Sequence, residues 1–425
     1  MNYSTCLFVL LALLWSNNLF AYDIAVENVD GVTIYYNYIN DGKELEVTYK
    51  QEYDYSIENC YNGIVNIPED VTYDGMTLNV TSISDYAFAH CEGLTSVTIG
   101  NNVISIGESA FYQCTSMTSL TIGNSVKTIK EGAFSHCKDL TSILVFCVPE
   151  HIEESIFNEC SNINDVTFDC EKVVSLFRDT YIRKITMTDK VTSIGMHAFM
   201  GCNNLTSVTI PNSVVEIGFS AFNGCKKLTS ATIGNNVTNL GQFSFYGTGL
   251  TSITIPGSIK TIGNSAFEGC TSLATVTIND GVSNIGSKAF KDCRKLSSSI
   301  YFPSSIKDID GKAFEGVMLD TVFVASQTPP QIREMSDEWS TFYAWYYPRY
   351  LYVPTGTVDK YKATIGWKDF WYIEELTPSS IRNFISNDAI EEKRYNINGE
   401  IISYPSKGIN IIKLKDGTIK KVLIK

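Results

Sequence analysis

A repeating phrase recurs through most of this chain of 425 residues: a short Ser-Val-Thr-Ile segment, then turn residues and an Ala-Phe pair. The Phe of the phrase returns every 22 to 24 residues, and one wider interval divides at Phe177 into two shorter ones. The marked positions are Phe88, Phe111, Phe134, Phe157, Phe177, Phe199, Phe222, Phe245, Phe267, Phe290 and Phe314. A fixed period of this length is typical of a solenoid, in which each unit buries its apolar side chains against its neighbours. The sequence therefore predicts a stack of eleven units.

Each unit is expected to contain two extended segments joined by turns. In the first segment, alternation places Val97 and Ile99 on one face of a strand and Thr98 on the other. The next coil supplies a partner strand in a parallel ladder, and Val103 with Ile106 marks the second extended segment. We expect the Ala-Phe pair to open a brief helical turn whose Phe ring fills the interior. The predicted fold class is an α/β repeat solenoid of short parallel strands and short helical turns.

Eight of the twelve Cys residues follow the repeat Phe by three positions. They are Cys91, Cys114, Cys137, Cys160, Cys202, Cys225, Cys270 and Cys293. Their spacing of one coil differs from the two-residue spacing of zinc ligands, so no metal site or cofactor is predicted. Because free Cys behaves as a small buried apolar residue, we expect a buried column of thiols. Cys147 and Cys170 share a second slot and are the candidate pair for a disulfide.

The first 21 residues have the pattern of a secretory leader. The apolar run of residues 6–15 is too short to span a bilayer, and Ala21 is a suitable cleavage position. No later segment is apolar enough to cross a membrane, so the mature chain is predicted to be exported without a transmembrane segment. The net charge of −13 and the pI near 4.9 argue against nucleic acid as a partner.

The repeats resemble the BspA-like class of leucine-rich repeats, which is common in surface proteins of Bacteroides-type bacteria. The match rests on A-F-x-x-C-x-x-L combined with S-I/V-T-I over about 240 residues. The resemblance implies a curved, right-handed leucine-rich-repeat coil located at the cell surface, at the outer membrane or outside the cell. It also implies adhesion to host or neighbouring-cell proteins, and it offers no catalytic residue to carry over.

The flanking segments differ in composition from the repeats and give the expected domain organisation. The expected parts are 1–21, signal peptide; 22–80, β-rich N-terminal cap; 81–324, repeats; 325–376, C-terminal cap; 377–393, linker; and 394–425, small β module. The last part is similar to C-terminal segments of exported Bacteroides-group proteins. It is therefore either a sorting or anchoring tail or a β module without a targeting role.

The outward slot of the first strand holds the candidate ligand-binding residues. They are Thr98, Thr121, Thr209, Thr232, Thr254, Thr277, Tyr301 and Phe323, with Trp345 from an aromatic-rich segment farther on. Thr suits a half-exposed strand, so the row has two interpretations: β propensity alone, or a weakly charged binding strip. The aromatic residues of 339–350 either seal the last coil or bind a partner.

No catalytic residue is predicted. His90 and His136 precede a repeat Cys, but adjacent residues of an extended chain point apart and other coils place different residues in the slot. The predicted function is that of a non-enzymatic, exported adhesion protein that binds a host matrix or bacterial surface protein through the solenoid. The alternatives are a glycan-binding surface protein that uses the C-terminal aromatics, and a structural component of the envelope.

Overall fold

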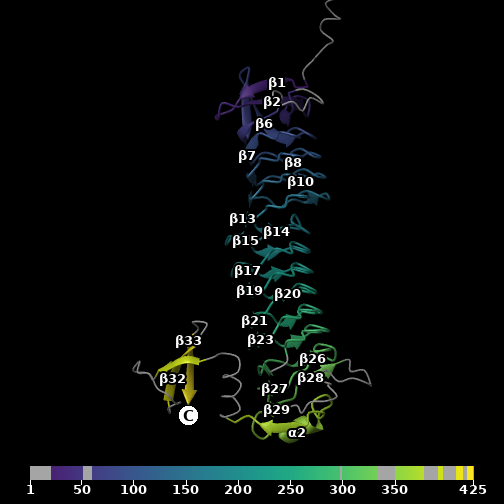
Figure 1. Cartoon of the computed structure of the whole chain (residues 1–425), viewed down its shortest axis with the longest axis vertical. Coiled ribbons are helices and arrows are strands. Elements are labelled where there is room, and N and C mark those ends of the chain that lie inside the picture. The colour runs from purple at the N-terminus through teal and green to yellow at the C-terminus, as the bar shows by residue number, and fades with distance from the viewer. Residues whose placement is uncertain are drawn as a thin grey trace, which may run out of the picture.

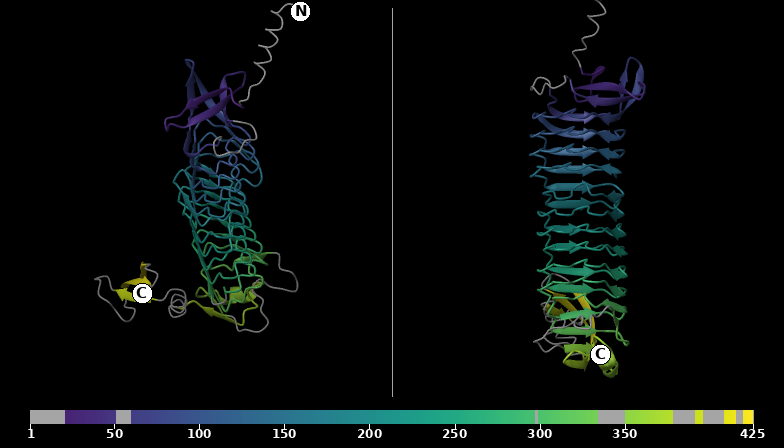
Figure 2. Two further views of the ribbon diagram at one scale, coloured as in Figure 1. Left: turned by 45° about the horizontal axis from the view of Figure 1, so that its top comes forward. Right: turned by 90° about the vertical axis from the view of Figure 1, so that its right-hand side faces the viewer.

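The computed structural model describes residues 21–50, 60–296, 299–333, 350–377, 391–395, 408–414 and 419–424. Residues 1–20 of the expected leader, residues 378–390 of the expected linker and Trp345 lie outside this description. The chain winds into an elongated stack of coils, and the strands of successive coils are stacked along the long axis of the molecule (Figures 1 and 2). The predicted repeat solenoid is confirmed.

One side of the stack, which we call the strand face, carries the first strand of each coil. It consists of β4 (Gly63–Ile67), β7 (Leu94–Ile99), β9 (Ser119–Ile122), β11 (Ser142–Val145), β13 (Asp165–Phe168), β15 (Lys184–Met187), β17 (Ser207–Thr209), β19 (Ser230–Thr232), β21 (Ser252–Ile255), β23 (Thr275–Ile278), β25 (Ser299–Phe302), β27 (Thr321–Val324), β29 (Tyr350–Val353) and β30 (Tyr372–Glu375). Neighbouring strands within each ladder are parallel. Since β4 precedes residue 81 and β29 follows residue 324, the face extends past both ends of the expected repeat range.

The second side carries two-residue and three-residue strands, also in parallel register. They are β8 (Ser105–Ile106), β10 (Thr128–Ile129), β12 (His151–Ile152), β14 (Lys172–Val173), β16 (Ser193–Ile194), β18 (Glu216–Ile217), β20 (Asn239–Leu240), β22 (Thr261–Ile262), β24 (Asn284–Ile285), β26 (Asp308–Asp310) and β28 (Gln331–Arg333). The N-terminal strands β1 (Ile24–Glu27), β2 (Thr33–Ile39), β3 (Glu44–Thr48), β5 (Asp70–Tyr73) and β6 (Met76–Ile83) join this side through the β6–β8 pairing. The first coil is therefore covered by hydrogen-bonded strands.

The expected helical turns are wrong, and so is the α/β fold class. Within the described residues, the one helix is α2 (Val358–Ala363), which lies beyond the repeats. At the Ala-Phe pair, the Phe88 N–H donates to Ala110 O of the next coil at 2.7 Å, whereas the Ala89 N–H donates back to Tyr86 O at 3.0 Å. Tyr86 and His90 have φ of 61° each, so the backbone alternates between turn and left-handed conformations. Every second N–H thus bonds between coils, and the pattern of an α-helix cannot form.

The repeat Phe rings form a stacked column inside the solenoid. Phe111 lies 4.6 Å from Phe88 and 5.1 Å from Phe134 between ring centroids, with interplanar angles of 8° and 10°. The column is interrupted at Phe168, whose ring contacts Phe177 and Phe199 edge-on at 5.7 Å each. Each stacked pair adds about 0.5–1.5 kcal/mol beyond the burial of its apolar area. The column therefore couples each coil to its neighbours.

The buried column of thiols is confirmed. All eight repeat Cys are buried and free, and each thiol from Cys114 onward donates to the carbonyl of a repeat Phe in the preceding coil, as Cys225 Sγ does to Phe199 O at 3.1 Å. Thr180 and Thr248 fill the same slot in two coils, but their hydroxyls donate within their own coil, to Phe177 O at 2.7 Å and to Phe245 O at 3.0 Å. The candidate disulfide pair, Cys147 and Cys170, is unbonded.

The end of the described chain forms its own antiparallel sheet. Its strands are β31 (Glu391–Tyr395), β32 (Gly408–Leu414) and β33 (Ile419–Ile424). β32 pairs with both of the other strands and forms an antiparallel pair with β33.

Candidate functional site

The outward row of Thr side chains lies in register along the strand face. Pairing places Thr98 beside Thr121, Thr209 beside Thr232, and Thr254 beside Thr277. The first pair is half-buried, whereas the other four are exposed. Stacking of coils thus brings the predicted Thr positions onto one side of the stack.

The aromatic end of the row differs from the expectation. Tyr301 is exposed at 37%, but Phe323 is only 4% exposed although it occupies the outward slot. The ring of Tyr352 stacks on Phe323 at 5.1 Å, and β29 supplies this ring from the segment expected to be a cap. Phe323 is therefore covered by the next coil. Tyr350 belongs to the aromatic segment that the sequence singled out, and it lies beside Tyr372 on this surface. Sequence reasoning missed Tyr352 and Tyr372, because the intervals beyond residue 324 depart from the repeat period.

The ladder of the strand face has three gaps, which fall between β15 and β17, between β19 and β21, and between β23 and β25. In each case a proline lies at the end of the later strand: Pro211 is two residues beyond β17, and Pro256 and Pro303 directly follow β21 and β25. At the same position of another coil, the Asn279 N–H donates to Ile255 O of the preceding coil at 3.0 Å. Proline has no N–H, so this bond between coils cannot form. The prolines therefore explain where the sheet divides.

A hollow of about 600 Å³ opens at the middle gap. Ala231 lines it from β19, in the inward slot that Val208 and Ile253 occupy in the coils on either side. The small side chain leaves space that a larger one fills elsewhere, and Ala231 itself is half-buried. The lining residues are Thr209, Ile210, Pro211, Asn212, Ser230, Ala231, Thr232, Ile233, Gly234, Asn235, Ser252, Ile253, Thr254 and Pro256.

The lining of the hollow contains hydroxyl and amide groups and no ionisable side chain. Its rim is held between coils, because the Asn235 N–H donates to Asn212 Oδ1 at 2.8 Å. Such a site can bind neutral polar groups by hydrogen bonds, and it offers no proton acceptor of the kind that general-base chemistry needs. Three predicted residues, Thr209, Thr232 and Thr254, meet here. Sequence reasoning missed Ala231 and Pro256, although a small residue and a proline in an otherwise regular repeat were visible signals.

The adjacent His and Cys residues do not form a reactive pair. His90 and His136 lie at the turn, with their rings edge-on to Tyr112 at 5.4 and 5.3 Å. The thiol of Cys137 lies inside the solenoid, and burial raises its pKa well above the usual range. A protonated, buried thiol is a poor nucleophile.

In the part of the chain that the structure describes, no group of three or more His, Cys, Asp or Glu side chains is arranged to hold a metal ion. A helix of sufficient length and apolar character to cross a membrane is also absent from these described residues.

The model of the BspA type leucine rich repeat region matches residues 81–206 and 192–320, with six copies. Among solved structures, the chain is similar to a leucine-rich repeat protein from Bacteroides ovatus, at 23% identity and a TM-score of 0.42, over 84% of this chain and 100% of the other. A leucine rich cell surface protein from Faecalibacterium prausnitzii shares 23% identity with a TM-score of 0.29, over 76% and 99% of the two chains. The pneumococcal vaccine antigen PcpA shares 15% identity with a TM-score of 0.37, over 84% and 99%. No curated protein matches the chain.

Proposed function

Because the chain belongs to the BspA-type leucine-rich repeat family, we propose that it is an exported, non-enzymatic surface protein that binds a protein partner through the strand face. Repeat solenoids present extended surfaces to macromolecular partners. The observation that carries the proposal is the hollow at the β19–β21 gap, which lies within the exposed Thr row and is lined by Thr232 and its neighbours.

The chemistry of the hollow defines the contact. A volume of about 600 Å³ accommodates a side chain or a loop tip, and its hydroxyl and amide groups can pair with uncharged polar groups of the partner. Exposed Thr residues on either side then extend the contact along the stack. A buried contact surrounded by weaker ones is the usual arrangement of an interface.

The test uses the chain without residues 1–21 and a panel of extracellular-matrix proteins, mucins and bacterial surface proteins, with binding measured by biolayer interferometry. Thr232→Lys puts a long charged side chain into the hollow, and Thr238→Lys puts the same side chain at an exposed position beside β20 on the second side of that coil. We expect T232K to weaken binding by about tenfold or more and T238K to leave it unchanged. Equal effects of the two variants, or no binding to any protein of the panel, would contradict the proposal.

The location is proposed from the leader and the family together. Protease treatment of intact cells should cleave the protein while a cytoplasmic marker stays whole. Survival of the chain in intact cells, followed by cleavage after lysis, would show that it is not exposed at the cell surface and would contradict that location.

A glycan-binding role is the second candidate, and the aromatic end of the strand face favours it. Trp371 and Tyr372 are 59% and 46% exposed there, and Tyr372 stacks on Tyr350 at 4.8 Å. Exposed rings of this kind offer apolar faces to a ligand. Binding on a glycan array that is lost in Trp371→Ala and kept in T232K would favour this role over the protein-binding one.

A further inference from the structure

One edge of the solenoid changes character along its length in an ordered way. We define the corner edge as the two residues that precede the Ala-Phe pair, or its equivalent, in each coil. These positions stack, because the Ser109 N–H donates to Glu131 O and the Ser220 N–H donates to Gln242 O of the next coil, both at 2.9 Å. The edge is acidic in the early coils, apolar in the middle and basic in the late coils. Its acidic members are Asp85, Glu108, Glu131 and Glu154, its apolar or aromatic members are Met196, His197, Phe219 and Phe243, and its basic members are Lys288 and Lys312.

The middle of the corner edge exposes an apolar cluster. Met196 is 59% exposed and Phe219 is 38% exposed. The Phe219 ring contacts His197 at 5.4 Å and Phe243 at 5.5 Å, and Phe243 contacts Tyr246, which is 37% exposed. Exposed large apolar groups gathered in one patch mark an interaction site.

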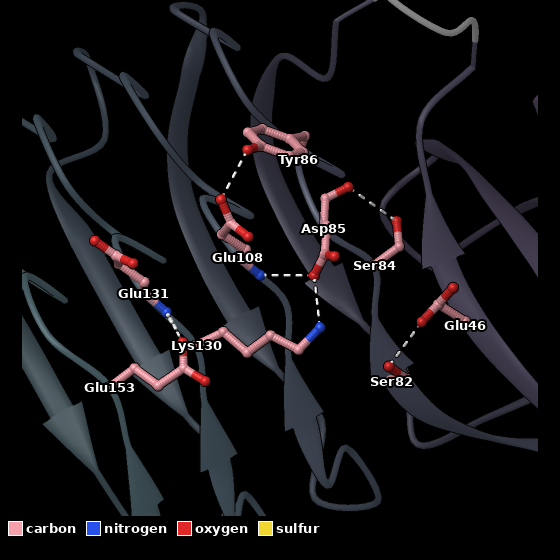
Figure 3. A network of polar contacts seen from close by, with 9 residues as sticks. All are labelled: Glu46, Ser82, Ser84, Asp85, Tyr86, Glu108, Lys130, Glu131 and Glu153. Carbon is pink, nitrogen blue, oxygen red and sulfur yellow. Dashed lines mark hydrogen bonds and ion pairs between the residues drawn. The ribbon is translucent and has the colours of Figure 1, made fainter.

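The acidic end is only partly neutralised within the chain (Figure 3). Lys130 binds Asp85 at 2.9 Å, the Glu108 N–H donates to the same carboxylate at 2.8 Å, and the Glu131 N–H donates to Glu153 at 2.8 Å. The carboxylates of Glu131 and Glu154 remain at exposed positions. Lys130 is thus one lysine against five carboxylates, so this end keeps a negative charge. The five carboxylates are those of Asp85, Glu108, Glu131, Glu153 and Glu154.

The spacing of the charges about Phe219 is symmetric. Counted by the repeat Phe of each coil, Glu131 lies four coils before Phe219 and Lys312 lies four coils after it, while Glu154 and Lys288 lie three coils before and after it. At about 4.8 Å per coil, the outer charges are about 19 Å from the centre on either side. A two-fold axis through Phe219, perpendicular to the stack, therefore places the acidic end of one chain on the basic end of a second copy.

We propose that the corner edge is the interface of an antiparallel, two-fold symmetric dimer. The apolar cluster packs on itself at the axis, and Glu131 and Glu154 of each copy face Lys312 and Lys288 of the other. A self-complementary patch of this kind is what a two-fold interface requires. The contact is about 40 Å long and about one coil corner wide, which is smaller than a typical stable interface, so we expect weak and reversible association.

The experiment is sedimentation equilibrium of the chain without residues 1–21, at low salt, over about a hundredfold range of concentration. Phe219→Asn places in this slot the residue that Asn264 already holds two coils later, so the fold tolerates it. Val215→Thr is the matched control, because it removes a 48% exposed apolar side chain from the second side, where Thr192 and Thr238 hold the equivalent slots. We expect F219N to weaken dimerisation by about tenfold or more and V215T to leave it unchanged.

Charge reversal tests the orientation of the two copies. Glu131→Lys and Lys312→Glu should each weaken the dimer, and the double variant should restore it, because each reversed charge then faces its opposite again. A wild-type chain that stays monomeric at every concentration, an F219N chain that dimerises normally, or a double variant as weak as the single ones would overturn the proposal. Partner binding at the strand face should be unchanged in F219N, so the two proposals fail separately.

Discussion

The thiol column makes the stability of the solenoid depend on pH in the alkaline range, and Cys202→Thr isolates one member of the column. Burial raises the pKa of the Cys202 thiol to about 12. Below about pH 9 the thiol is protonated in the folded and the unfolded chain, so its full contribution to stability is present. Above that pH the unfolded chain releases the proton and the folded chain keeps it, so the free energy of unfolding falls as the pH rises toward 12.

The size of the effect follows from the shift. For one such thiol, the free energy of unfolding falls by about 1.4 kcal/mol for each pH unit between the pKa of the unfolded chain and that of the folded chain. The loss at pH 10.5 is therefore about 2 kcal/mol. Thr at position 202 copies the hydroxyl that Thr180 and Thr248 already place in this slot, and a hydroxyl does not titrate in this range. Other groups that ionise are common to both proteins and cancel in the comparison.

The assay is urea unfolding at pH 8 and at pH 10.5, followed by circular dichroism. We expect the wild-type chain to lose about 2 kcal/mol more than C202T between the two pH values. Thr248→Ser serves as the control, because it changes a slot that never titrates and should show the wild-type dependence on pH. If the wild type and C202T lose the same stability, the thiol is not held protonated by burial and the reasoning is refuted.

Three further predictions concern the core, the hollow and the surface. Ala231→Ile fills the hollow with the residue that Ile253 places in this slot; it should raise stability by about 1–2 kcal/mol in urea unfolding while weakening capture of the protein partner, and unchanged capture would remove the hollow from the interface. Phe222→Ala removes a fully buried ring stacked at 5.3 and 5.1 Å on its neighbours and should cost about 3–5 kcal/mol, whereas a smaller loss would mean that the column repacks. Asp85→Asn breaks the exposed ion pair with Lys130 and should lower the free energy of unfolding, measured in urea, by less than about 1 kcal/mol. A larger loss would show that the polar network in Figure 3 acts as a unit.

The repeat made the stacking predictable. Because each coil repeats the same residues at the same intervals, the ring of Phe111 and the thiol of Cys114 meet copies of themselves in neighbouring coils. The period thus predicted a solenoid, a buried aromatic and thiol column and an outward Thr row before any contact was known. The same period failed at the Ala-Phe turn, where Ala and Phe are compatible with a helix and only the hydrogen bonds to the next coil decide against one.

The sequence by itself determined which side chains share a slot, since a constant period gives every copy the same place in its coil. Only the tertiary structure decided what happens where a slot is filled differently: Pro256 opens the ladder, Ala231 leaves the hollow beneath it, and Tyr352 covers Phe323. Each of these outcomes depends on a pair of coils. The missing N–H, the missing volume and the covering ring act on the neighbouring turn of the chain, so no single unit of the sequence contains them.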